Sequence, residues 1–142
     1  MQGLHLTGDL SGCRCDPALL TDSAALEALC SAAVEAAGLA QVKRLFHAFA
    51  PSRDARAAGG NARAPGRDAL APGSGITGVV LLAESHLAVH TWPELASVTL
   101  DVYVCNYGGD NSVKAQALFD ALCNKFDAAG VQSHLLHRGE PS

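Results

Sequence analysis

Alternating and clustered apolar residues along the chain predict six β-strands. The pattern is clearest in residues 97–105, where valine or leucine occupies every second position and Cys105 is the last residue. One face of this strand would then carry Asp101, Tyr103 and Cys105, since successive side chains of a strand point to opposite sides. The predicted strands are residues 4–10, 42–49, 76–83, 87–92, 97–105 and 131–137.

Two further segments carry the apolar stripe of an amphipathic helix. In residues 24–37 the apolar residues recur at helical spacing, after the potential capping residue Asp22 and before Gly38. Residues 111–128 carry a second stripe and precede Gly130. Each segment is therefore predicted to be a helix that packs one face on the core.

Consecutive strands between two helices indicate an α+β fold, a two-layer α/β sandwich. Its sheet would be mainly antiparallel, with the helices on one face. The chain has 142 residues, of which 49% are hydrophobic, which suits a single domain over residues 1–142.

Residues 51–75 differ in composition from the rest of the chain. They are mostly Ala, Gly, Pro and Arg, and Leu70 is the only large aliphatic residue among them. Such a segment buries too little apolar surface to offset the entropy lost on ordering. It is predicted to be a flexible insert loop, with a lid over an active site as the alternative.

Charge and cysteine content exclude several classes of protein. The net charge is -4 and the cationic residues are scattered, so no nucleic-acid partner is expected. No apolar run approaches the roughly 18–20 residues that cross a bilayer, and the first residues lack the pattern of a signal peptide, so no membrane association is expected. The cysteines number 5 and are irregularly spaced, which favours free thiols in a cytoplasmic protein.

The densest group of reactive residues lies in residues 84–94, with Cys105 following one strand later. One interpretation is a hydrolase, in which His86 or His90 activates Ser85 and Asp101 orients the histidine. No Gly-x-Ser-x-Gly motif surrounds Ser85, which argues against it. A second interpretation is a zinc site. Its ligands would be His86, His90, Glu94 and Cys105.

A histidine pair four residues apart binds metal best across a helical turn, whereas this segment is predicted to be a strand. No metal is therefore expected.

The third interpretation is a self-cleaving proenzyme. Residues 77–94, TGVVLLAESHLAVHTWPE, resemble the processing site of prokaryotic S-adenosylmethionine decarboxylase proenzymes. The similarity extends to residues 3–6, to residues 46–49 and to the strand ending at Cys105. It covers most of the chain apart from residues 51–75.

The resemblance implies cleavage between Glu84 and Ser85, into chains 1–84 and 85–142. Ser85 would become a covalent pyruvoyl group, which serves as the cofactor in decarboxylation. His90 would accept a proton during processing and Cys105 would donate one during decarboxylation. Thr77 falls where the family carries a hydroxyl residue that assists processing.

The substrate implied by the resemblance is the small molecule S-adenosylmethionine, with its decarboxylated form used in spermidine synthesis. Glu94 would bind the ribose hydroxyls, while Phe49 and Trp92 would contact the adenine and the sulfonium. Two departures from the family leave alternatives open, because Asn106 stands where glycine usually follows the catalytic cysteine and residues 51–75 are inserted.

One alternative is a decarboxylase of ornithine or arginine, whose distal cation would need a carboxylate from Asp101, Asp110 or Glu94. Another alternative is a regulatory homologue without activity, although the residues needed for processing and catalysis are present.

Two structural expectations accompany this interpretation. Residues 85 and 90 would point to opposite faces of one continuous strand, so contact between them would require a turn at residues 84–86. We therefore predict that residues 76–83 and 87–92 form a hairpin with the scissile bond at its turn. We also expect a homodimer, with the active site at or near the subunit contact. The family resemblance implies it, and the second face of the sheet has too few predicted elements to cover it.

Overall fold

The computed structural model describes residues 1–50 and 72–139 and contains one antiparallel sheet of six strands. The strand order is β2-β3-β4-β5-β1-β6, and every neighbouring pair is antiparallel. The strands are β1 (Gln2–Cys13), β2 (Gln41–Ala48), β3 (Ile76–Leu82), β4 (Ser85–Trp92), β5 (Ser97–Cys105) and β6 (Ala128–Gly139). The helices are α1 (Ala18–Thr21), α2 (Ser23–Ala36), the 3-10 turn η2 (Pro93–Leu95) and α4 (Ser112–Phe126).

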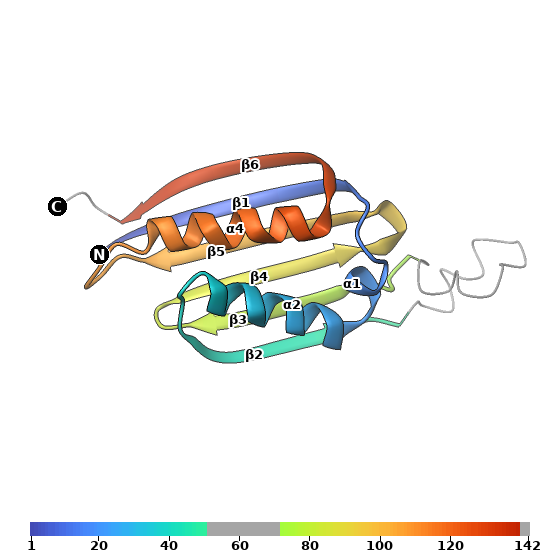
Figure 1. Ribbon diagram of the computed structural model, residues 1–142, viewed down its shortest axis with the longest axis horizontal. Helices are drawn as coiled ribbons and strands as arrows, with labels where there is room; N and C mark the ends of the chain where they lie inside the picture. The colour runs from blue at the N-terminus through green and yellow to red at the C-terminus, as the bar shows by residue number, and fades with distance from the viewer. Residues whose placement is uncertain (51–71, 140–142) are drawn as a thin grey trace, which may run out of the picture.

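The two long helices lie side by side on one face of the sheet (Figure 1). Helix α2 packs over β2 and β3, whereas α4 packs over β1 and β5. None of the described elements covers the other face. This arrangement, together with the similarity to a solved structure reported below, confirms the predicted α+β sandwich with helices on one face.

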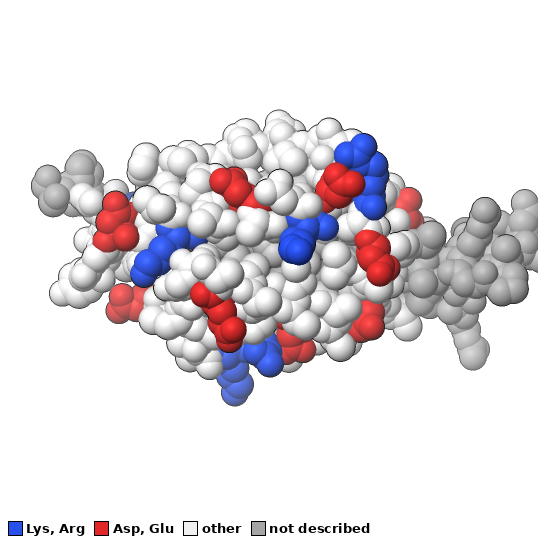
Figure 2. Space-filling model, in the orientation of Figure 1, with Lys and Arg blue, Asp and Glu red and all other residues white. Residues whose placement is uncertain are grey.

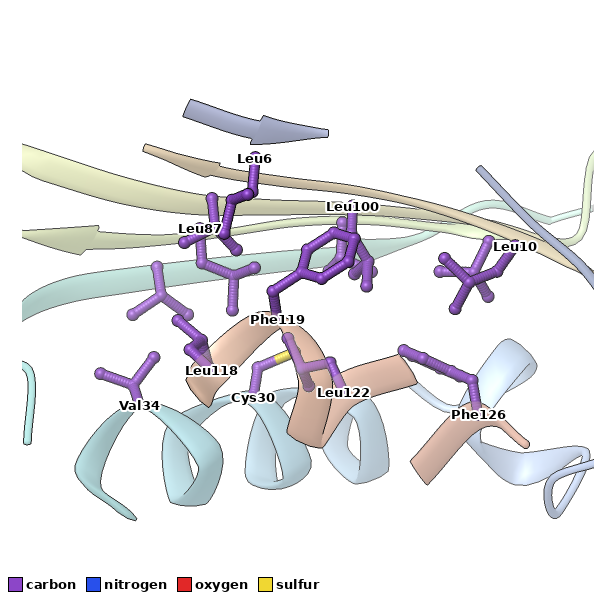
Figure 3. Packing of buried hydrophobic residues seen from close by; sticks show 14 of the residues in the cluster. Leu6, Leu10, Cys30, Val34, Leu87, Leu100, Leu118, Phe119, Leu122 and Phe126 are labelled. Carbon is purple, nitrogen blue, oxygen red and sulfur yellow. The ribbon is translucent and has the colours of Figure 1, made fainter. Parts of the chain in front are cut away.

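The core lies between the helices and the face of the sheet that they cover (Figure 3). Leu87 and Leu100 project from the sheet towards Leu118 and Phe119 of α4. Gly8 on β1 makes room for the aromatic ring, because a Cβ there would lie 2.6 Å from Cζ of Phe119. The full burial of Leu87, Leu100 and Leu118 explains the apolar periods seen in the sequence.

Most predicted element boundaries agree with the structure within one to three residues. Helix α2 begins after Asp22, whose carboxylate accepts hydrogen bonds from the N–H groups of Ala24 and Ala25. Helix α4 ends earlier than expected, because Asp127 adopts a left-handed conformation with φ of 46°. Gly130 lies within β6, where a Cβ would approach Ser11 Oγ to 2.8 Å.

The helical face shows no concentration of one charge sign. Figure 2 shows Lys and Arg mixed with Asp and Glu over this face. Within residues 1–50 and 72–139, no helix has the length and hydrophobicity needed to cross a membrane.

Most of the predicted insert, residues 51–71, lies outside the described residues. Its last residues are described, and Ser74 and Gly75 are buried. The Gly75 carbonyl accepts a hydrogen bond from Phe49 N–H at 2.9 Å, so this end of the segment pairs with the chain that leaves β2.

Candidate active site

The Glu84–Ser85 bond lies at the turn of the β3–β4 hairpin, as predicted. Leu82 pairs with Ser85, so only Ala83 and Glu84 form the connection. Glu84 is exposed and has φ of 56°, a left-handed conformation that costs about 1–2 kcal/mol for a residue other than glycine. The bond expected to be cleaved is therefore accessible, and the residue before it is strained.

Ser85 and Cys105 meet at this end of the sheet. The Cys105 N–H donates a hydrogen bond to Ser85 Oγ over 3.0 Å. Ser85 also lines a cavity of about 180 Å³ on the helical side, together with Asn111 and Lys114 of the α4 region. Cys105 is buried at the end of β5, where strand alternation assigns its side chain to the uncovered face.

His90 and Thr77 pair at the opposite end of the hairpin. The Thr77 hydroxyl lies 3.1 Å from Nδ1 of His90. Both side chains lie on the uncovered face, because their neighbours Ile76, Val89 and Thr91 are buried beneath the helices.

The hairpin does not bring His90 to Ser85, and this part of the prediction is wrong. The turn comes before Ser85, so both residues lie on β4. Five residues of a strand span about 17 Å, and the two side chains point to opposite faces. Within one protomer the residues expected to act in processing form two separate groups.

A pocket of about 350 Å³ lies beside His90. It is lined by Phe49, Trp92 and Glu94, so the three residues predicted to bind substrate are brought together. The buried Oε2 atom of Glu94 has no hydrogen-bond partner among the described residues. A buried carboxylate oxygen without a partner is costly, so a hydrogen-bond donor placed in this pocket would be favourable.

Thr91 fixes the floor of this pocket. Its hydroxyl accepts from Ile76 N–H and donates to the Leu20 carbonyl, both over 2.8 Å. The second bond explains the role of α1, a short helix that the sequence analysis did not predict. Together these bonds hold the end of β4, from which Trp92 projects.

The uncovered face also carries a polar cluster that the sequence analysis missed. His5 Nε2 lies 3.1 Å from Asp101 Oδ1, and His86 packs against Tyr103 with ring centroids 5.6 Å apart. The guanidinium of Arg138 lies 5.5 Å from the centre of the Tyr103 ring. Polar residues at every second position of β1, β4 and β5 point to this cluster, but the three strands are known to be neighbours only from the structure.

This cluster argues against the hydrolase interpretation, because Asp101 is bonded to His5 rather than to His86 or His90. The proposed zinc ligands are also divided, since Cys105 lies at the Ser85 end of the sheet and Glu94 at the His90 end. Among residues 1–50 and 72–139, no group of three or more His, Cys, Asp or Glu side chains is arranged to hold a metal ion.

Comparisons with known proteins confirm the resemblance seen in the sequence. The sequence model of the S-adenosylmethionine decarboxylase family matches residues 4–139. An S-adenosylmethionine decarboxylase proenzyme from Picrophilus torridus is 31% identical over 96% of this chain and 84% of the relative. One from a Hydrogenobaculum species is 32% identical, over 96% and 81% respectively.

A solved structure is similar as well. The crystal structure of an adenosylmethionine decarboxylase from Aquifex aeolicus superimposes with a TM-score of 0.74 at 28% identity. The similarity covers 99% of this chain and 92% of the other, so the whole described fold is shared.

The environment of His86 predicts that acid destabilises the fold. Burial lowers the pKa of His86 below its ordinary value of 6.5, and the nearby His5 acts in the same direction while Asp101 opposes it. Since the folded chain then binds fewer protons than the unfolded chain, its free energy of unfolding should fall as the pH drops below about 6.5. Urea unfolding should show a smaller acid loss for His86→Asn, whereas the exposed His134→Asn should behave as wild type. An unchanged acid loss in His86→Asn would contradict this assignment.

Proposed function

Because this chain belongs to the S-adenosylmethionine decarboxylase family, we propose that it is a self-processing proenzyme that decarboxylates S-adenosylmethionine. The observation that carries the proposal is the placement of Glu84–Ser85 at an exposed, strained turn, with Ser85 Oγ bound by the Cys105 N–H. Both features suit a serine that attacks the carbonyl preceding it.

The processing reaction starts from the chain itself. Ser85 Oγ attacks the Glu84 carbonyl carbon, the Ser85 nitrogen leaves that carbon with a proton, and an ester forms. A base removes the Ser85 Cα proton, the Cβ–Oγ bond breaks, and the Glu84 carboxylate departs. Water then replaces the nitrogen of the resulting dehydroalanine, releasing ammonia and leaving a pyruvoyl group on the chain 85–142.

The structure fits a pyruvoyl group at residue 85. Cleavage at the turn breaks a connection of two residues outside the core and removes the strain at Glu84. The group supplies a carbonyl that accepts the electron pair left when carbon dioxide departs. The backbone of Cys105 lies beside Ser85. Its thiol, which strand alternation assigns to the uncovered face, is proposed to return a proton to the substrate carbon as a general acid.

The base is proposed to come from a second copy of the chain. His90 lies about 17 Å from Ser85 along β4, with Thr77 paired beside it on β3, too far for proton transfer within one protomer. The uncovered face also exposes large apolar side chains. Leu45, Leu81 and Leu136 on this face are 71%, 45% and 49% exposed. An apolar surface of this kind is typical of an interface between subunits.

A homodimer satisfies both observations. A two-fold axis that lies between two facing sheets and crosses the strands at right angles reverses the ends of β4 in the partner. The His90 end of one protomer then faces the Ser85 end of the other. Each complete site would combine Cys105 and the exposed Glu84–Ser85 turn of one chain with His90, Thr77 and the substrate pocket of its partner. Ser85 lines the helical side within one protomer, so its side chain would turn towards the interface during processing.

The pocket favours S-adenosylmethionine over ornithine or arginine. Phe49 and Trp92 offer aromatic faces to an adenine ring and a sulfonium, while the unpartnered Glu94 oxygen can accept bonds from ribose hydroxyls. The other carboxylates considered for a distal cation are engaged elsewhere, Asp101 with His5 and Asp110 with the Ser112 N–H.

The product would be the aminopropyl donor for spermidine synthesis. A cytoplasmic location is proposed because all five cysteines are free.

We expect the purified protein to consist of two chains, residues 1–84 and 85–142, the second beginning with a pyruvoyl group. Ser85→Ala should remain a single chain, since it lacks the attacking oxygen. Intact-mass spectrometry distinguishes the two cases. Wild-type protein that stays uncut, with an unmodified Ser85 after prolonged incubation, would contradict self-processing.

The shared site predicts complementation between two inactive variants. Ser85→Ala and His90→Ala should each remain uncut alone, but when they are co-expressed the His90→Ala chain should be cut, because the Ser85→Ala partner supplies His90. The Ser85→Ala chain should stay intact. Different tags on the two chains allow each to be followed on a denaturing gel.

In the matched control, the Ser85→Ala chain is replaced by a Ser85→Ala, His90→Ala double variant. The His90→Ala chain should then stay uncut, because neither chain supplies His90. If mixed dimers form and the His90→Ala chain still remains whole with the single variant, His90 does not act across a subunit contact.

The substrate is tested by carbon dioxide release from S-adenosylmethionine, ornithine and arginine in parallel. Release is expected from S-adenosylmethionine alone. Glu94→Gln should raise the KM for that substrate about tenfold, the effect of losing one hydrogen bond to a charged group, while the chain is still cut. Release from ornithine or arginine without release from S-adenosylmethionine would contradict the proposed substrate.

A further inference from the structure

The loop after β5 holds the backbone of Cys105 in place. The side-chain amide of Asn111 donates to the Cys105 carbonyl over 2.9 Å. On the other side of the same peptide unit, the Asn106 N–H donates to the Gln2 carbonyl over 2.8 Å. The peptide unit between Cys105 and Asn106 is therefore bound at both its polar groups, although β5 ends here.

Asn111 bonds to the Cys105 carbonyl and makes no helix-capping hydrogen bond. It occupies the N-cap of α4, where an asparagine side chain usually accepts a bond from the first turn of the helix. No such bond is present at Asn111, and the Ser112 N–H is instead bound by Asp110. The Asn111 side chain therefore does not cap the helix and bonds to the Cys105 carbonyl instead.

The orientation of Asn111 is itself fixed. The Asn106 side-chain oxygen accepts a bond from the Asn111 N–H over 2.9 Å, while its amide group donates to Ser112 Oγ over 3.0 Å. Asn106 thus fixes the loop and Asn111 holds the Cys105 carbonyl. The N–H of the same residue, in the preceding peptide unit, binds Ser85 Oγ. These bonds connect the start of α4 to the serine through the backbone of residue 105.

We propose that Asn111 is a positioning residue for self-processing, which acts by holding the Cys105 N–H against Ser85 Oγ. The inference rests on the self-processing reaction proposed above. In the elimination step the Cβ–Oγ bond breaks and its electron pair moves onto Oγ, which becomes part of the Glu84 carboxylate. The Cα proton goes to the base. The Cys105 N–H thus faces the atom on which negative charge grows, where a positioned donor is most effective.

Cys105 accordingly contributes in two ways, through its main-chain N–H in processing and through its thiol in decarboxylation. The first contribution does not depend on the thiol, so Cys105→Ala should still be cut. Variants of Asn111 affect the first contribution without altering any group that reacts.

The test compares Asn111→Asp and Asn111→Leu with wild type. Both variants keep the size of the side chain and lose the amide donor. We expect cleavage to slow at least about tenfold, and the ester to accumulate because its elimination is impaired. Hydroxylamine reveals the ester by cutting it to a Glu84 hydroxamate and an unmodified Ser85. Asn111→Gln, which retains an amide donor, should recover part of the rate.

The matched controls are Asn124→Asp and Asn124→Leu, the same changes at an exposed position of the same helix, which should be cut at the wild-type rate. If the Asn111 variants do not fold, Asn106→Ser removes the bond that orients Asn111 and should produce the same ester.

Wild-type cleavage rates in the Asn111 variants, or slow cleavage without ester, would overturn this inference. Failure of the wild-type chain to cleave would instead overturn the proposed function.

Discussion

The alternation of β4 between the two faces of the sheet is the constraint on which the rest of the site depends. Leu87 and Val89 are fully buried beneath the helices, so His86 and His90 must lie on the opposite face. A shift of one residue would exchange these sets and expose side chains whose burial contributes about 1.5–3 kcal/mol each. Core packing thereby fixes which reactive groups can meet.

The same constraint separates the reactive groups within one protomer. A strand is extended, so Ser85 at its start and His90 near its end cannot approach each other, whatever the shape of the hairpin. The proposed dimer would use the uncovered face to bring them closer. This face carries His90, Thr77 and exposed leucines, and a second copy placed on it would bring opposite ends of β4 together. Dimerisation and catalysis would then depend on one surface.

Three residues at the site depart from ordinary structural preferences. Glu84 has a left-handed backbone without being glycine, and Asn111 does not cap its helix. Glu94 buries an oxygen that has no hydrogen-bond partner in the described part of the chain. Among the described residues other than glycine, the remaining left-handed ones are Ala96 and Asp127. They occupy the C-caps of η2 and α4, where such a conformation is common. The remaining departures cluster where the chemistry is proposed, as expected when local stability gives way to function.

The sequence by itself determined the strands and long helices, because periods of two and of 3.6 record which side chains are buried. It also led to the turn at Glu84–Ser85, although the reason given, contact between Ser85 and His90, was wrong. Contiguous motifs such as residues 77–94 can be recognised without coordinates. The resemblance carried by these motifs also indicated Phe49, Trp92 and Glu94 as candidate substrate-binding residues.

Only the tertiary structure decided how these residues are grouped. The sheet order places β1 between β5 and β6, which creates the His5–Asp101 pair from residues far apart in the chain. It also shows that the turn precedes Ser85, so that β4 carries both Ser85 and His90 and keeps them apart. Hydrogen bonds such as those from Asn111 to Cys105 and from Cys105 to Ser85 leave no periodic signal, because they depend on where one strand ends beside another.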